Sequence, residues 1–133
     1  MKRAARYADG WLPYMYTPEM LADSMTKIAA FTEEAGRPAG TVKGGLFIFT
    51  CVHEDRATAL DLANQQLSRQ YNQDFSKLVE KYTIAGSPAD CIARLQEYID
   101  AGARTIMFSQ GCPPDYVDEN TRLIAETILP AFR

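Results

Sequence analysis

The sequence predicts an α/β fold with a parallel sheet. Segments with helical periodicity alternate along the chain with short apolar segments, in the order strand, helix, strand, helix, helix, strand, helix. Residues 46–52 and 105–108 are apolar on successive positions, which is typical of strands that helices cover on both faces. These observations favour parallel strands joined by right-handed helical crossovers.

The first half of the chain contains a short strand and a capped helix. Residues 3–7 form the end of a helix, and residues 8–12 a strand that Pro13 ends. Thr17 is the expected N-cap of the next helix, which ends at Gly36. The apolar face of this helix consists of Leu21, Met25, Ile28 and Ala29, with Phe31 at its edge.

The central strand is the strongest strand signal of the sequence. Gly44 and Gly45 are expected to form a tight turn that leads into residues 46–52, at the centre of the sheet. Glu54 and Asp55 open the following helix, which is expected to continue, with a break, through Leu78. Its inner stripe consists of Leu60, Ala63, Leu67 and Tyr71.

The C-terminal part repeats the unit of helix, glycine turn and strand. Ser87 is the expected N-cap of a helix with Pro88 at its first position, and Gly102 ends that helix in a left-handed conformation. The third strand covers residues 104–109 and is expected to be buried on both faces. A last helix begins near Asp115, turns Val117, Ile124 and Ile128 inward, and ends by Pro130.

Composition limits the classes of function. The 133 residues, 47% of them hydrophobic, are expected to form a single domain, 1–133. A net charge of −3 without a long basic run argues against nucleic acid and anionic membranes as partners. No apolar run approaches the roughly 20 residues needed to span a bilayer, and the N-terminus lacks the apolar segment of a signal peptide.

Cysteine and histidine usage bounds the redox compartment and the metal chemistry. Cys51, Cys91 and Cys112 are odd in number and widely spaced, which predicts free thiols and a cytoplasmic location. His53 is the single histidine, so a multi-histidine metal site within one chain is excluded, and no metal is expected.

Three stretches resemble the bacterial luciferase-like monooxygenase family. They are "RAARYADGW" (3–11), "EEAGRP" (33–38) and "AGSPADCIARLQEYIDAGARTIMF" (85–108), which resemble the middle and the C-terminal signature of that family in the same order. The resemblance implies an enzyme: a flavin-dependent oxidoreductase or monooxygenase. It would bind reduced FMN or a deazaflavin at the carboxyl ends of the strands of a (β/α)8 TIM barrel. Reduced FMN would activate O₂ to oxygenate a small organic substrate, or a deazaflavin would pass on hydride.

Such a barrel needs about 250 residues. The resemblance therefore makes this chain a C-terminal fragment, with strands 8–12, 46–52 and 104–109 as the last three β/α units and with no catalytic residue assigned. Three parallel strands leave both sheet edges open. Exposing even ~400 Å² of apolar surface forfeits roughly 10 kcal/mol, comparable to a whole folding stability of about 5–15 kcal/mol. We therefore expect a homo-oligomer, such as a dimer, or a second polypeptide that completes the barrel.

The resemblance places the first candidate site residues near the flavin ring and the substrate. Asp9, Gly10 and Trp11 end the first strand, and the Trp11 indole is suited to stack on a flat ring. The alternative is structural: Asp9 caps a turn, Gly10 takes a positive φ and Trp11 fills the core.

Further candidates follow the other two strands. His53 could hydrogen-bond a ligand or form a nucleophilic pair with Cys51, but the adjacent Glu54 and Asp55 fit better as helix charges than as an orienting carboxylate. Ser109 and Gln110 follow the last strand as polar contacts for a ligand, or as a surface loop. Ser87 is expected to be an ordinary cap rather than part of an anion site.

Two non-enzymatic functions remain open beside the flavin enzyme. One is a non-catalytic, truncated relative that acts as an interaction module. The other is a small-ligand-binding module that uses the exposed apolar face as its cleft.

Overall fold

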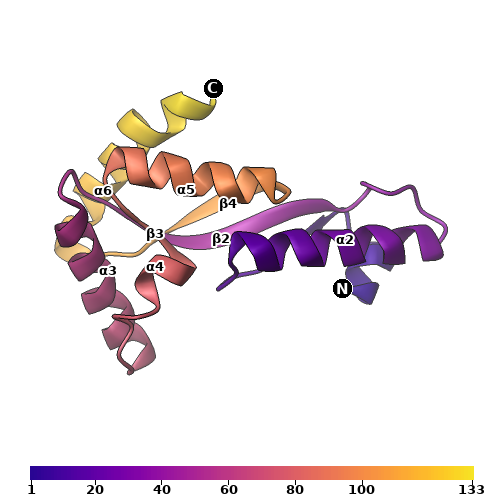
Figure 1. The fold of residues 1–133 in the computed structure, drawn as a ribbon, viewed down its shortest axis with the longest axis horizontal. Coiled ribbons are helices and arrows are strands. Elements are labelled where there is room, and N and C mark those ends of the chain that lie inside the picture. The colour runs from indigo at the N-terminus through magenta and orange to yellow at the C-terminus, as the bar shows by residue number, and fades with distance from the viewer. The chain divides into compact units, whose positions relative to one another are not determined.

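The computed structural model describes residues 1–133, and helices alternate with strands along much of the chain (Figure 1). The elements are α1 (Lys2–Tyr7), β1 (Gly10–Trp11), α2 (Pro18–Glu34), β2 (Lys43–Val52), α3 (Arg56–Tyr71), α4 (Val79–Tyr82), β3 (Thr83–Gly86), α5 (Pro88–Asp100), β4 (Ala103–Gln110), the 3₁₀ turn η1 (Pro114–Tyr116), α6 (Val117–Leu123), the π-helical turn η2 (Ile124–Ile128) and the 3₁₀ turn η3 (Leu129–Phe132).

A four-stranded sheet with parallel pairing confirms the α/β class. β2 is its central strand, since β1, β3 and β4 all pair with it. β1 pairs in parallel with the start of β2 (Gly10 with Lys43), and β3 pairs in parallel with its end (Phe49 with Thr83, Val52 with Gly86). The three predicted strands correspond to β1, β2 and β4. β3 is a fourth strand that the sequence analysis does not predict.

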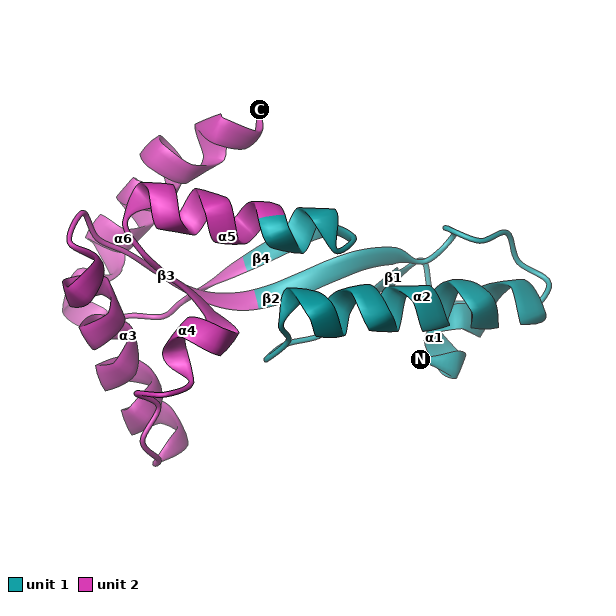
Figure 2. Ribbon diagram, viewed as in Figure 1, with its two compact units in different colours: residues 1–47, 97–107 teal, residues 48–96, 108–133 magenta.

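The chain divides into two compact units (Figure 2). Unit 1 consists of residues 1–47 and 97–107, and unit 2 of residues 48–96 and 108–133. The boundaries fall inside β2, α5 and β4, so these elements contribute residues to both units.

In unit 1, α2 packs against α1, and its Met25 side chain lies beside Gly44 of β2 and Gly102, just before β4. Thr17 caps α2 as predicted, accepting a hydrogen bond from the Met20 backbone N–H at 3.3 Å. Leu21 and Ile28 are buried as expected, whereas Met25 and Ala29 are only half-buried. Ser24 and Thr32 complete the inner face, and the Thr32 hydroxyl is satisfied by the Ile28 carbonyl at 2.6 Å.

Gly44 and Gly45 lie inside β2, so the prediction of a tight entry turn is wrong. Both positions are buried, and close packing against backbone explains the glycine at position 44. A Cβ on Gly44 would stand 2.4 Å from the Gly102 carbonyl oxygen, and one on Gly45 would stand 2.7 Å from Leu12 Cδ1. Gly102 has a φ of 113°, which confirms its positive φ at the end of α5.

The core of unit 2 forms around the second half of β2. Residues 48–52 are all buried, together with inward side chains of α3, β3, α5 and the last helical region. α3 begins after Asp55, whose carboxylate accepts hydrogen bonds from both the backbone and the hydroxyl of Thr58; these bonds lower the pKa of Asp55. α3 ends at Tyr71 because Asn72 is left-handed (φ 51°), and α4 begins only at Val79, after the predicted break.

β4 differs from its prediction as a fully covered strand. Thr105 and Met107 are exposed, whereas Ile106 and Phe108 are half-buried. Because successive side chains point to opposite faces, the face of β4 with Thr105 and Met107 is open. An apolar run shows that both faces are suited to burial, but not that another element covers them.

The last helical region begins with η1 at Pro114, and α6 follows from Val117. Ile124 and Ile128 are buried as predicted, but Val117 is half-buried and helical turns continue past Pro130 to Phe132. None of the helices has both the length and the apolar character that crossing a membrane requires.

Candidate functional site

The six predicted site residues fall into two groups in different units. Asp9, Gly10 and Trp11 belong to unit 1, at the start and carboxyl end of β1. His53, Ser109 and Gln110 belong to unit 2, at the carboxyl ends of β2 and β4. Each group is therefore a local arrangement with its own partners.

The β1 segment is held through its backbone. The Asp9 carbonyl accepts a hydrogen bond from the Lys43 backbone N–H at 2.8 Å, and Trp11 lies opposite Gly44 in the register. Gly10 lies in the strand and has no positive φ, so that part of the structural alternative is wrong. The Asp9 carboxylate, 96% exposed, pairs with Arg37 at 3.2 Å instead of capping a turn.

Trp11 is half-buried, with an aromatic neighbour on one side. The Tyr16 ring lies edge-on to the indole, with centroids 5.5 Å apart and an interplanar angle of 75°. Tyr16 is anchored in turn, because its carbonyl accepts a hydrogen bond of 2.6 Å from the Tyr98 hydroxyl. The intervening Met15 has a left-handed φ of 55°, a conformation that persists only where the surroundings hold it. The indole therefore has a defined orientation before any ligand arrives.

His53 follows β2 and is oriented by two backbone groups. Its own N–H donates to the Gly86 carbonyl at 3.0 Å, which continues the pairing of β2 with β3. Its ring Nδ1 accepts a hydrogen bond from the Asp55 N–H at 2.9 Å. A neutral imidazole that accepts at Nδ1 carries its proton on Nε2, so Nε2 is then the N–H donor of His53.

His53 lines a small surface hollow with the last helical region. The hollow has a volume of about 220 Å³ and is lined by His53, Glu54, Tyr116, Glu119 and Leu123. The rings of His53 and Tyr116 are 5.8 Å apart and tilted by 33°. This volume is below the roughly 300–1,000 Å³ of typical ligand pockets, so the hollow suits a small group or one end of a larger ligand.

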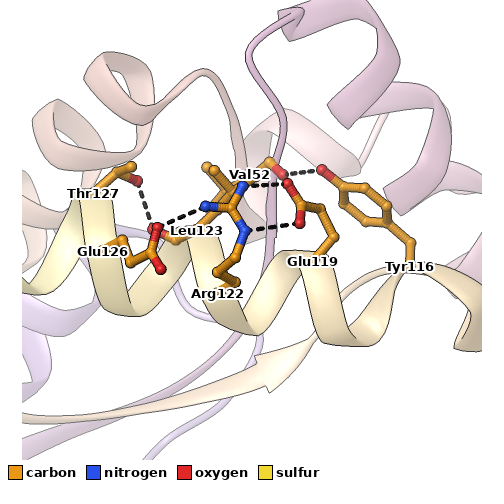
Figure 3. Close-up of polar contacts among 7 residues, drawn as sticks. All are labelled: Val52, Tyr116, Glu119, Arg122, Leu123, Glu126 and Thr127. Carbon is orange, nitrogen blue, oxygen red and sulfur yellow. Dashed lines mark hydrogen bonds and ion pairs between the residues drawn. The ribbon is translucent and has the colours of Figure 1, made fainter.

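Polar contacts fix the far wall of this hollow (Figure 3). The Tyr116 hydroxyl donates to the Val52 carbonyl at 2.7 Å, and burial raises the pKa of Tyr116 to about 12, so the hydroxyl keeps its proton at neutral pH. Arg122 binds both Glu119 and Glu126. The hydrogen bond from Arg122 lowers the pKa of Glu119, which keeps this carboxylate charged at the rim.

Gln110 is engaged inside the protein rather than facing a ligand. Its amide oxygen accepts from Asn120 Nδ2 at 2.8 Å, and its Nε2 donates to the Thr121 hydroxyl at 2.9 Å. Ser109 is half-buried on β4, next to Gln110. Of the two, Gln110 serves first to connect β4 to α6.

Asn120 is the residue of this region that the sequence analysis missed. It is fully buried, and its amide pairs with the β2 backbone as a neighbouring strand would: Oδ1 accepts from Val52 N at 2.7 Å, and Nδ2 donates to Thr50 O at 2.8 Å. The available signal was its position on the stripe of Val117, Ile124 and Ile128, where a polar side chain must find partners.

The geometry supports neither a Cys51 nucleophile nor an anion site at Ser87. The Cys51 thiol is fully buried and burial raises its pKa to about 12, so it is no thiolate nucleophile at neutral pH. At the start of α5, the Asp90 carboxylate accepts the Ser87 backbone N–H at 3.0 Å, and Ser87 Oγ accepts the Asp90 N–H at 3.2 Å. This reciprocal cap confirms Ser87 as a capping residue and fills the position that an anion would need.

Comparison with known proteins decides the family. A family model described as luciferase-like monooxygenase matches residues 1–105 of the 133. The chain belongs to this family. No curated protein sequence matches the luciferase-like chain.

Solved structures share the fold of this luciferase-like chain. They include a coenzyme F420-dependent tetrahydromethanopterin reductase from Methanopyrus kandleri (20% identity, TM-score 0.74), which matches over 99% of this chain and 48% of its own. An F420-dependent secondary alcohol dehydrogenase, in complex with an F420–acetone adduct, matches at 19% identity and a TM-score of 0.76, over 99% and 45% of the two chains. A monooxygenase from Streptomyces bottropensis matches at 18% identity and a TM-score of 0.71, over 99% and 44%. The luciferase-like chain thus spans about half the length of these proteins.

Proposed function

We propose that this chain forms part of the flavin pocket of a luciferase-like, flavin-dependent oxidoreductase or monooxygenase. The observation that carries the proposal is the family match over residues 1–105, supported by the shared fold. In this proposal residues 1–133 act as one domain that corresponds to the last three β/α units of a TIM barrel. The cofactor is FMN or a deazaflavin, in keeping with the family and with the F420 dependence of two of the matched proteins.

Two of the candidate residues fit a flavin on the geometry of their side chains. Trp11 offers a half-buried, pre-oriented indole that can stack on a flat ring, and His53 offers an Nε2–H donor to a ring carbonyl or a phosphate. In the proposal Asp9 and Gly10 contribute beside Trp11 in unit 1, and Ser109 contributes in unit 2. Gln110 contributes less because its amide is engaged with Asn120 and Thr121. The bound flavin supplies the redox chemistry; the protein orients the substrate and excludes water.

The proposal includes a partner, which is a second copy of the chain or another polypeptide segment that completes the barrel. Every large hydrophobic residue that is strongly exposed lies in unit 1, and these residues are Met1, Tyr7, Leu12, Tyr14, Met20 and Met107. β1 and β4 each pair only with β2, which leaves an open edge on both. Three buried free thiols support a cytoplasmic location.

Flavin titration tests the cofactor. Addition of FMN to about 100 µM should shift the visible flavin spectrum and quench flavin fluorescence, since this concentration detects even weak binding. Trp11→Phe and His53→Ala should weaken the response, while Tyr7→Phe, an exposed tyrosine on α1, serves as the matched control. A wild-type chain that responds neither to FMN nor to a deazaflavin at this concentration contradicts the proposal.

A non-catalytic interaction or small-ligand-binding module is the second candidate. Its supporting observation is that the chain spans about half the length of the matched enzymes, together with the exposed apolar residues of unit 1. Measuring the molar mass in solution with and without FMN separates the two. A stable oligomer that is indifferent to FMN, or a co-purified apolar ligand, favours the module.

A further inference from the structure

The backbone after α2 has a defined conformation, which fixes the position of Arg37. Gly36 is left-handed (φ 77°), and its N–H donates to the Glu33 carbonyl at 2.9 Å. The Arg37 N–H donates to the Thr32 carbonyl at 3.0 Å. These two bonds form a Schellman motif, which ends the helix with one defined exit path.

The Arg37 guanidinium binds the second half of α1 and the two residues that lead from it into β1. Its Nη1 donates to the Ala5 and Ala8 carbonyls, each at 2.9 Å, and its Nη2 contacts Asp9 Oδ1 at 3.2 Å. The Arg37 side chain is 24% exposed, whereas the Asp9 carboxylate is almost fully exposed. The two shielded carbonyl bonds therefore hold the segment, and the ion pair adds little.

This contact lies directly before Trp11 in the chain. β1 starts two residues after Ala8 and ends at Trp11. Arg37 thus holds the entry to β1, the pairing with Lys43 and Gly44 holds its inner edge, and Tyr16 abuts the indole.

We propose that Arg37 is a positioning residue that orients Trp11 for contact with a flat, flavin-type ring. The inference rests on the proposed function, in which Trp11 meets the flavin. It also explains why "RAARYADGW" and "EEAGRP" occur together: the arginine of the second stretch binds backbone carbonyls of the first.

The single tryptophan of the chain makes the test specific, because all tryptophan emission reports on Trp11. Arg37→Ala removes both carbonyl bonds, and Arg37→Lys keeps the charge without the planar fork. Arg104→Ala is the matched control, since Arg104 Nη1 also binds two carbonyls in unit 1, those of Ile99 and Ala103, each at 2.9 Å.

For Arg37→Ala we expect Trp11 emission at longer wavelength and stronger acrylamide quenching, with helical circular dichroism retained. The midpoint of Trp11 quenching by FMN should rise about tenfold, the equivalent of one lost hydrogen bond. Arg37→Lys should fall between the wild type and Arg37→Ala. Arg104→Ala should leave both readouts at their wild-type values.

The proposal is overturned if Arg37→Ala keeps the wild-type values of Trp11 emission, acrylamide quenching and FMN midpoint. It is also overturned if Arg104→Ala changes these readouts as much as Arg37→Ala does. If Arg37→Ala does not fold, the comparison of Arg37→Lys with Arg104→Ala decides in the same way. A wild-type chain that responds neither to FMN nor to a deazaflavin overturns the proposed function instead. In that case the Trp11 emission and acrylamide quenching still test whether Arg37 fixes the position of Trp11.

Discussion

At the residue scale, the buried Asn120 side chain makes three hydrogen bonds in the core of unit 2. Its amide binds the Val52 N–H, the Thr50 carbonyl and Gln110 Oε1 at distances of 2.7 to 2.8 Å, and the side chain is fully buried. A buried polar group that loses its partner pays its full desolvation cost. Removing the Asn120 side chain would leave the Val52 N–H and the Thr50 carbonyl of β2 buried without this hydrogen-bond partner.

We predict that Asn120→Ala lowers the free energy of unfolding by about 2–4 kcal/mol, because several buried groups lose their partner at once. Urea unfolding followed by circular dichroism measures the loss. Thr121→Ala, one residue on and exposed, is the control, and it should cost at most about 1 kcal/mol. If Asn120→Ala and Thr121→Ala lower the free energy of unfolding equally, the hydrogen bonds from Asn120 to β2 do not stabilise the fold more than an exposed side chain does.

Asp90 gives unit 2 a dependence on acidic pH. The Ser87 backbone N–H is the main cause that lowers the pKa of Asp90, with the Ser87 hydroxyl and the nearby Arg56 adding to it. A carboxyl with a lower pKa in the folded state stabilises the fold above its unfolded pKa, about 3.9. This contribution is lost as the pH falls through the folded-state pKa.

We therefore predict that unfolding experiments below about pH 4 show a smaller decline in stability for Asp90→Asn than for the wild type. Arg56→Gln should keep most of the wild-type decline, because it leaves the Ser87 cap intact. A comparison of urea midpoints at neutral and acidic pH measures both. If Arg56→Gln flattens the profile as much as Asp90→Asn, the ion pair and not the cap is responsible.

At the element scale, helix ends were predictable because they depend on neighbours in the sequence. Thr17, Asp55 and Ser87 cap their helices as the sequence indicates, and Gly102 has its positive φ. Each of these features needs only residues three or four positions away. Local chemistry was therefore sufficient for these four helix ends, but not for the last helical region, which continues past Pro130 to Phe132.

The strands were less predictable because their partners are distant in the sequence. β3 has four residues, and only its register against β2, more than 30 positions earlier, makes it a strand. The open face of β4 and the buried amide of Asn120 likewise depend on what does or does not pack there. For the candidate site, the sequence predicted which residues lie at strand ends. It did not predict that the Gln110 amide hydrogen-bonds to Asn120 and Thr121.

Gly44 shows how a single position controls the packing of β2 against the turn between α5 and β4. A Cβ there would stand 2.4 Å from the Gly102 backbone oxygen, which cannot swing away as a side chain does. We predict that Gly44→Ala lowers the free energy of unfolding by about 1–3 kcal/mol, the usual cost of overpacking. Thermal or urea unfolding measures it.

Gly10→Ala is the control for Gly44→Ala, because its Cβ would lie 3.7 Å from the Lys43 carbonyl oxygen, in ordinary contact, and Gly10 has no positive φ. This variant should fold with nearly wild-type stability. If both alanine variants behaved alike, general β-strand propensity would explain the effect better than the close approach of Gly102.

At the scale of the whole molecule, charge and apolar exposure are divided between the two units. Unit 1 has seven lysine and arginine residues against seven aspartate and glutamate residues, whereas unit 2 has seven against ten. The net charge of −3 therefore belongs to unit 2. Unit 1 is neutral and carries the exposed large hydrophobic residues, so it is the surface suited to association.

We predict that the chain self-associates at micromolar concentration through unit 1, with little weakening by salt, because apolar contacts are not screened. Sedimentation equilibrium should give a mass above the 14.9 kDa of one chain. Tyr14→Lys and Met107→Lys, each at a side chain at least 50% exposed, should lower that mass without loss of stability. Gln70→Lys adds the same charge to exposed α3 of unit 2 and should leave the mass unchanged. A wild-type chain that sediments as a compact monomer would contradict the prediction, and the apolar side chains of unit 1 would then be tolerated in water.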